Sequence, residues 1–194
     1  STQTYAAACV DGANADGCTI STTDITYTLT GDIEPASGVI GIKFNSGADR
    51  NNVTQTGNIT TTGDSARGLE FYESDSNTTS LTGNITTTGI ASHVLLLTGG
   101  ASGSNNNITS LTGNITTTGV SAYGLYLWES DSNTFSLTGN ITTAERFAYG
   151  LVLTGSDINI TTLTGNITTA GDSAHGLFLS SSDSNITTLT GNIT

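Results

Sequence analysis

The nonapeptide LTGNITTTG occupies residues 81 to 89 and returns letter for letter at residues 111 to 119. Shortened forms begin at residues 137, 163 and 189. The glycine of its TG[ND]I core recurs with spacings of 26, 26, 30, 26, 26 and 26 residues, at Gly31, Gly57, Gly83, Gly113, Gly139, Gly165 and Gly191. Self-similarity at a fixed period is the sequence signature of a stacked repeat protein.

Each period holds three short runs in which apolar and polar residues alternate, as they do in β-strands. The runs are NIT with its following threonines, GLxL, and NxTxL. No segment carries the apolar spacing of an amphipathic helix. Strands this short bury no face alone, so each must pair in parallel with its equivalent one period away. The sequence therefore predicts an all-β fold, a single-stranded parallel β-helix (β-solenoid) of about seven coils, with about 26 residues and three short strands per coil.

A solenoid places equivalent side chains in columns, and the apolar columns are expected inside. The isoleucine of NIT, the leucines of GLxL and the leucine of NxTxL supply three such columns, with Gln55 as the polar intruder. Stacked asparagine amides hydrogen-bond along a column. Such a ladder is expected beside one turn, at Asn51, Asn77, Asn107, Asn133, Asn159 and Asn185.

The chain divides into a predicted N-terminal cap, residues 1 to 23, and repeats from residue 24 to residue 194. The longer repeat carries a four-residue insertion within residues 98 to 107, at a turn where a stacked coil tolerates added length. Cys9 and Cys18 are the two cysteines, and the turn residues between them predict a short disulfide loop in the cap. A disulfide indicates an oxidising, extracytoplasmic setting.

Charge excludes some classes of function. The formal net charge is −12, from 16 Asp and Glu against 4 Lys and Arg. Such a chain repels nucleic acid. The most apolar run, VLLL at residues 94 to 97, is too short to insert into a membrane. The four basic residues are scattered and the carboxylates recur in columns, so no catalytic constellation or cofactor is expected.

Asparagine and threonine flank each isoleucine of NIT and are expected to face outward. A solvated β-face explains them by strand propensity alone. Every NIT is also an N-glycosylation sequon, and an outward asparagine in a secreted protein is a candidate sugar carrier. The candidates are Asn58, Asn84, Asn114, Asn140, Asn166 and Asn192.

The same threonines resemble the Thr-x-Thr faces of solenoid antifreeze proteins, in which flat arrays of outward threonine order water. Ala144 and Ala170 replace the second threonine in two coils, and asparagine enters the face. This irregularity disfavours ice binding.

Acidic residues align at the turn before the asparagine ladder, at Asp75, Asp131, Asp157 and Asp183. Like charges one coil apart repel, and a bound calcium ion would relieve them. A row of solvated turn aspartates explains the same pattern, and a GGxGxD calcium loop is missing. Calcium is therefore a weak expectation.

Aromatic and basic residues form a candidate contact stripe around GLxL, where exposed rings hold sugars or a neighbouring protein. A cross-strand stacking ladder is the alternative interpretation. The stripe comprises Arg67, His93, Tyr123, Tyr149, His175, Tyr126, Trp128 and Phe178.

TGNITTTG, followed by a small residue, GLxL and SDSN, resembles the degenerate repeats in passengers of bacterial autotransporters and related surface adhesins. The resemblance covers roughly residues 24 to 194. It implies a rod on the surface of a prokaryote that displays contacts or spaces them from the membrane.

The leading hypothesis is a non-enzymatic extracellular structural protein, a subunit of a cell-surface fibre. An uncovered coil at LTGNIT, residues 189 to 194, would present strand edges and an apolar cross-section, so further repeats or a second copy are expected there. Head-to-tail stacking of copies builds open filaments. The alternative is an adhesin segment that binds carbohydrate or a host surface through the aromatic stripe.

Overall fold

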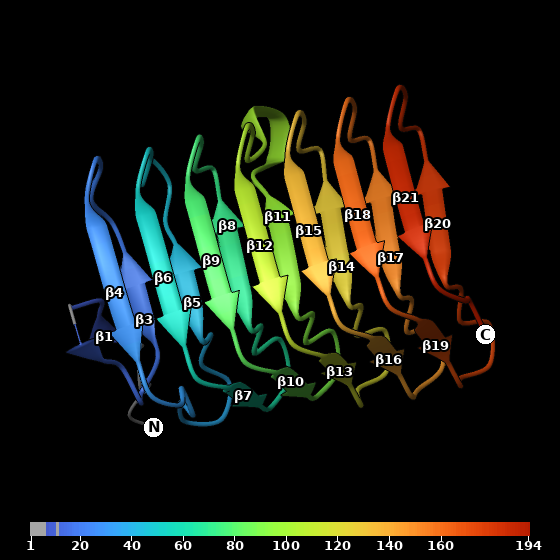
Figure 1. Ribbon diagram of the computed structural model, residues 1–194, viewed down its shortest axis with the longest axis horizontal. Helices are drawn as coiled ribbons and strands as arrows, with labels where there is room; N and C mark the ends of the chain where they lie inside the picture. The colour runs from blue at the N-terminus through green and yellow to red at the C-terminus, as the bar shows by residue number, and fades with distance from the viewer. Residues whose placement is uncertain (1–6, 11) are drawn as a thin grey trace.

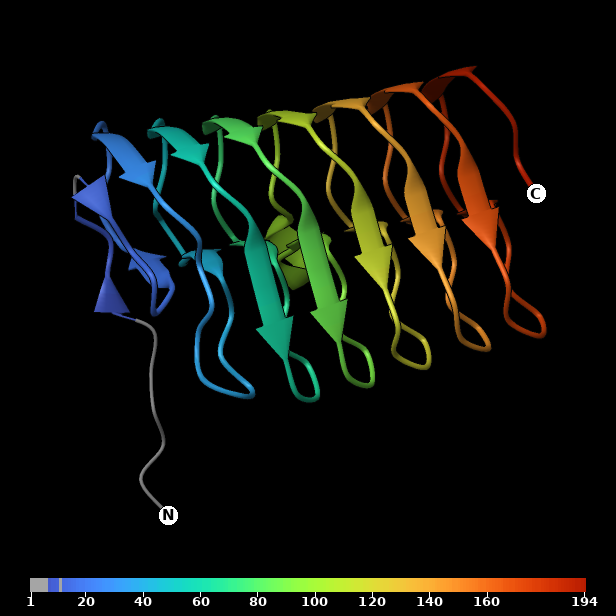
Figure 2. The same cartoon turned by 60° about the horizontal axis from the view of Figure 1, so that its bottom comes forward.

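The computed structural model describes residues 7–10 and 12–194. Within them the chain forms a β-solenoid of three parallel sheets with one 3-10 turn (Figure 1), as the 26-residue period predicts. The coils follow one another along a single axis from the N-terminal to the C-terminal end (Figure 2). Residues 1–6 and 11 of the predicted cap lie outside the described residues, and the cap boundary at residue 23 stays a prediction.

Sheets A and B take one strand from each successive coil, and sheet C takes one from each coil between β7 and β19. Sheet A runs in the order β1 (Ala7–Ala8), β3 (Cys18–Ile20), β5 (Ile42–Phe44), β8 (Leu69–Tyr72), β11 (Leu95–Thr98), β14 (Leu125–Trp128), β17 (Leu151–Thr154) and β20 (Leu177–Ser180). Sheet B runs in the order β2 (Gly12–Ala13), β4 (Thr26–Thr30), β6 (Asn52–Thr56), β9 (Thr78–Thr82), β12 (Ile108–Thr112), β15 (Thr134–Thr138), β18 (Ile160–Thr164) and β21 (Ile186–Thr190). Sheet C runs in the order β7 (Ile59–Thr62), β10 (Ile85–Thr88), β13 (Ile115–Thr117), β16 (Ile141–Thr143) and β19 (Ile167–Thr169).

The register aligns equivalent residues of neighbouring coils. Ile85 pairs with Ile59 on one side and Ile115 on the other, and Leu125 pairs with Leu95 and Leu151. The insertion stays in the turn between β11 and β12, where the 3-10 turn η1 (Gly100–Ser102) forms. The strands on both sides of the insertion therefore keep their register.

The core is the apolar interior of the solenoid. Ile59, Ile115 and Leu125 are at most 1% exposed, and burying each such side chain contributes about 2 kcal/mol. Gln55 is buried among them, and its Nε2 donates to the carbonyl oxygen of Gly31 at 2.8 Å. The interior-facing residues of the last described coil are less covered, with Leu177 37% and Ile193 49% exposed.

The glycine before each outward asparagine is required by the close approach of successive coils. Gly113 has φ 147°, and a Cβ there would overlap the carbonyl oxygen of Gly83 one coil back. Backbone that approaches backbone this closely leaves no room for a side chain.

The N-terminal segment is tied to the first coils. Cys9 and Cys18 form the predicted disulfide, with their Cα atoms 4.6 Å apart. β1 pairs with β3, and β3 pairs with β5, so this segment continues sheet A at its N-terminal edge.

Candidate functional site

The aromatic stripe lies on the outward side of sheet A, where its rings stack from coil to coil. Tyr123 lies 4.7 Å from His93 and 5.2 Å from Tyr149, with near-parallel planes in both pairs. Tyr149 continues to His175 at 4.9 Å. Aromatic pairs at these distances stabilise neighbouring strands. The stacking ladder is therefore present, and a contact role for the stripe stays a prediction.

His93 does not lie on the open surface as the outward column suggests. Its side chain is only 7% exposed, since Tyr123 stacks on the ring and Tyr126 meets it edge-on at 5.3 Å. Burial, together with the nearby Arg67 charge, lowers the pKa of His93 to about 3. The imidazole is therefore neutral, and its Nδ1 accepts the backbone N–H of Tyr123 at 3.0 Å.

The tyrosines of the stripe are half-buried. Burial raises the pKa of Tyr123, and the phenols of Tyr126 and Tyr149 add to this. Burial also raises the pKa of Tyr126, with a further contribution from Glu129. Their hydroxyls stay protonated and can donate hydrogen bonds.

The sequon asparagines form a ladder on the surface. Each side-chain Oδ1 accepts the backbone N–H of the next asparagine in the C-terminal direction, at 2.8 to 2.9 Å. Asp32 begins the ladder by accepting from Asn58 at 2.7 Å. The side chains are exposed, so a glycan on Nδ2 would leave the Oδ1 bonds intact. The ladder comprises Asn58, Asn84, Asn114, Asn140, Asn166 and Asn192.

A second asparagine ladder is largely buried and runs in the opposite direction. The Oδ1 of Asn107 accepts the backbone N–H of Asn77 at 2.9 Å, from the coil on its N-terminal side. Its Nδ2 donates to the carbonyl oxygen of Ser74 at 2.9 Å. Equivalent Oδ1 bonds repeat at Asn77, Asn133, Asn159 and Asn185. The predicted amide ladder is therefore present. Backbone N–H groups donate to the amide oxygens, and the Nδ2 atoms of Asn51 and Asn77 also donate to the Oδ1 of the next asparagine at 3.1 Å.

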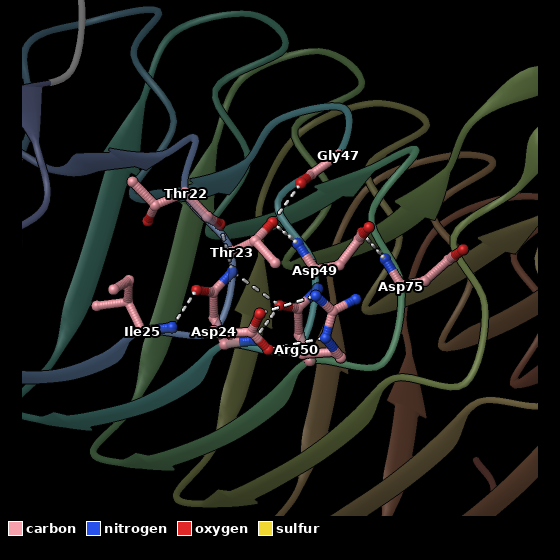
Figure 3. A network of polar contacts seen from close by, with 10 residues as sticks. Thr22, Thr23, Asp24, Ile25, Gly47, Asp49, Arg50 and Asp75 are labelled. Atoms are coloured by element: carbon pink, nitrogen blue, oxygen red, sulfur yellow. Dashed lines mark hydrogen bonds and ion pairs between the residues drawn. The ribbon is translucent and has the colours of Figure 1, made fainter.

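The aspartate column is bonded to the backbone in the same way. Figure 3 shows its first steps, in which Asp75 donates its backbone N–H to Asp49, and Asp49 donates to Thr23. Asn105 lies between Asp75 and Asp131, which the sequence pattern did not reveal. The carboxylates of Asp131 and Asp157 accept the N–H of Asp157 and Asp183 at 2.7 and 2.6 Å. These N–H groups offset the like-charge repulsion between carboxylates of successive coils.

One exposed ion pair accompanies this turn (Figure 3). The Nε and Nη2 atoms of Arg50 donate to the two carboxylate oxygens of Asp24 at 2.7 and 2.8 Å. These hydrogen bonds hold the pKa of Asp24 below its usual value.

Sheet B presents an uncharged hydroxyl face that the NIT pattern did not indicate. On its outward side the last residue of each strand from β4 to β21 is an exposed threonine. A parallel column of threonine and serine lies beside it, including Thr54, Ser80 and Thr162. The unbroken column comprises Thr30, Thr56, Thr82, Thr112, Thr138, Thr164 and Thr190.

A hollow of about 320 Å³ opens on sheet A beside the aromatic stripe. It is lined by Arg67, His93, Tyr126 and Trp128 of the stripe, and by four residues the sequence analysis did not single out. A signal for two of them was present, because the residue after GLxL reads Tyr72, Thr98 and Trp128 in successive coils. The four additional residues are Glu70, Tyr72, Leu96 and Thr98.

Across residues 7–10 and 12–194, no three His, Cys, Asp or Glu side chains gather closely enough to hold a metal ion. In the same part of the chain, no helix has the length and apolarity needed to cross a bilayer.

Comparison with known proteins gives no relative. No protein-family model matches the chain, and no curated protein or solved structure matches it significantly.

Proposed function

We propose that the chain is a non-enzymatic structural element of an extracellular fibre or rod on a prokaryotic cell surface. The observation that carries the proposal is the continuity of bonding along the axis. Backbone pairing, two asparagine ladders and an aspartate column join each coil to the next. Repeats held only by their neighbours produce elongated molecules whose length scales with repeat number.

The apolar interior is open to solvent at the last described coil. Leu177, Leu179 and Ile193 are 37 to 49% exposed there, although their equivalents in inner coils are buried. Sheet edges β20 and β21 have no strand beyond them among the described residues. A further coil, from the same polypeptide or from a second copy, would cover both the apolar side chains and the strand edges.

A matched pair of variants tests this assembly. Purified protein is examined by electron microscopy and light scattering over a range of concentrations, and rods longer than one chain are expected. Replacing both Leu177 and Ile193 with lysine should abolish them by placing charge in the contact. Ile90→Lys, at a side chain 55% exposed on a turn, is the control and should still assemble. Uniform monomers of the unaltered chain at high concentration would contradict the self-association.

The disulfide and the surface asparagines support the extracellular placement. The resemblance to autotransporter passengers and adhesins supports the cell-surface location. Peptide mass spectrometry of the native protein should find the Cys9–Cys18 bond. Where the host glycosylates sequons, sugar is expected on Asn114 but not on buried Asn107. Reduced cysteines in freshly isolated protein would count against an oxidising compartment.

The hydroxyl face of sheet B favours a second candidate function, the binding of ice. Seven threonines stand in one unbroken column, and the outward residues of the sheet B strands β4, β6, β9, β12, β15, β18 and β21 include no charge. Thermal hysteresis measurements test this directly. Activity that is lost in Thr112→Lys but kept in Thr116→Lys, on sheet C, would support this candidate. Absence of hysteresis in the unaltered chain would remove it.

A further inference from the structure

The hollow on sheet A arises from one short side chain between two long ones. Thr98 pairs in register with Tyr72 of β8, and Trp128 is its counterpart in β14. Tyr72 and Trp128 are 41% and 45% exposed, whereas Thr98 is 8% exposed and Leu96 5%. The two rings therefore rise on either side of a low floor made by β11.

The width of this gap suits one ring. Strands β8 and β14 are two rungs apart, about 9.6 Å at the usual strand spacing of about 4.8 Å. An object in van der Waals contact with both walls needs about 3.5 to 4 Å on each side. A single saturated six-membered ring fits between the walls, and its C–H faces are of the kind that pack on aromatic rings.

Unsatisfied polar groups lie at one end of the hollow. Glu70 is 5% exposed, and its Oε2 atom is buried without a hydrogen-bond partner. The Nε of Arg67 is buried without a partner as well, and the two side chains approach each other only at 3.7 Å, between Nη1 and Oε2. Buried polar atoms normally have partners, so this pair is poised to hydrogen-bond with something that enters.

His93 adds a hydrogen-bond donor to the lining of the hollow. Because its Nδ1 accepts from the backbone of Tyr123, the neutral ring carries its proton on Nε2. The lining thus combines a carboxylate acceptor, guanidinium and imidazole donors and the Thr98 hydroxyl with apolar ring surface.

Charge selects against other ligands. An anion would meet the carboxylate of Glu70, and a cation would meet Arg67. The Lys43 ammonium already lies 5.7 Å from the centre of the Tyr72 ring, which disfavours a quaternary ammonium ligand on that wall. The rings of Tyr126 and Trp128 are parallel, with an interplanar angle of 1°, and so do not form the converging walls of a cation cage.

We infer that this hollow binds one neutral pyranose residue of a carbohydrate. The sugar packs its C–H surface against Tyr72 and Trp128 and directs its hydroxyls to Glu70, Arg67 and His93. This site is a function beyond the structural role proposed above and does not depend on it. Its presence would make the rod an adhesin.

The chain contains its own reporter, because Trp128 is its single tryptophan. The experiment titrates the full chain with methyl glucoside, methyl galactoside and N-acetylglucosamine while tryptophan fluorescence is recorded. A saturable change with at least one of the three is expected, in the millimolar range typical of a small ligand. No saturable change with any of them would overturn the proposal.

Two variants keep the reporter and locate the site. Thr98→Tyr fills the floor without touching either wall, and Tyr72→Ala removes one wall. Each should weaken binding about tenfold or more. Phe178→Ala, on the same sheet and 38% exposed, should bind as the unaltered chain does. Unchanged binding in a folded Thr98→Tyr variant, checked by circular dichroism, would overturn the assignment, as would a response to choline or phosphate with none to sugar.

Discussion

The tripeptide Asn-Ile-Thr occurs at residues 107 to 109 and again at residues 114 to 116, in two opposite environments. In the first, Asn107 is 1% exposed and Ile108 is 47% exposed. In the second, Asn114 is exposed and Ile115 is 1% exposed. Seven positions separate the two copies, and an odd separation reverses which face each residue occupies in an alternating chain. Position relative to the coil, and not local sequence, decides burial here.

The largest loss of stability is expected from a substitution in the turn between the two tripeptides. Gly113→Ala would place a Cβ against the carbonyl oxygen of Gly83 and should lower the free energy of unfolding by about 4 kcal/mol or more. Gly100→Ala is the control, since φ is 55° and no atom lies within 4 Å of the added Cβ. It should cost about 1 kcal/mol. Equal losses in urea denaturation would show that coil contact at Gly113 is looser than described.

Replacing Asn107 and Asn114 one at a time should show that the buried ladder contributes more to stability than the exposed ladder. Asn107→Ala leaves the buried N–H of Asn77 and the carbonyl of Ser74 without this partner, and should cost about 3 kcal/mol. Asn114→Ala frees an exposed N–H of Asn140 that water can reach, and should cost less than about 1 kcal/mol. Urea midpoints of the two variants provide the measurement. A larger loss in Asn114→Ala would reverse the assignment of the two ladders.

The same contrast between buried and exposed copies applies to the histidines of the stripe. The pKa of His93 is about 3 in the fold and about 6.5 in the unfolded chain, so only the unfolded chain takes up a proton between these values. Stability should therefore fall as pH drops from 6.5 towards 3, by about 2 kcal/mol at pH 5.

Two histidine variants assign this acid sensitivity. His93→Gln should remove most of it, whereas His175→Gln, at an exposed side chain, should retain it. Urea denaturation at several pH values measures both. An unchanged pH slope in His93→Gln would show that another group is responsible.

The smallest change in stability is expected at the residue before each asparagine of the buried ladder. Ile158 precedes Asn159 with φ 58°, a left-handed conformation that a β-branched residue rarely adopts. Asn106 occupies the equivalent position two repeats earlier, with φ 56°. Ile158→Asn should raise stability by about 1 kcal/mol. Ile160→Asn, in extended strand β18, should lower it slightly, and thermal melting of both variants tests the difference.

Periodicity was sufficient to predict the fold. A fixed period assigns each residue to a column, and alternation within each strand assigns inward or outward direction. The Ile59 and Leu125 columns, the buried asparagine ladder and the site of the insertion all followed from this. The Cys9–Cys18 pair followed from spacing and turn residues.

The surface was less predictable, because it depends on differences between coils. His93 is buried because Tyr123 and Tyr126 cover it, and the hollow exists because Thr98 is shorter than its neighbours in the column. The repeated motif predicts neither feature, because both depend on residues that differ from one coil to the next. The hydroxyl face of sheet B does follow from the repeat, because a threonine comes directly after the leucine or glutamine of each NxTxL run.

The opposed directions of the two asparagine ladders give the molecule a polarity. In the outer ladder a coil receives N–H groups from its C-terminal neighbour, and in the inner ladder it receives them from its N-terminal neighbour. Reversing one coil would mismatch both ladders at once. The longer assembly proposed above would therefore be vectorial, with chemically distinct ends and a single orientation of every coil.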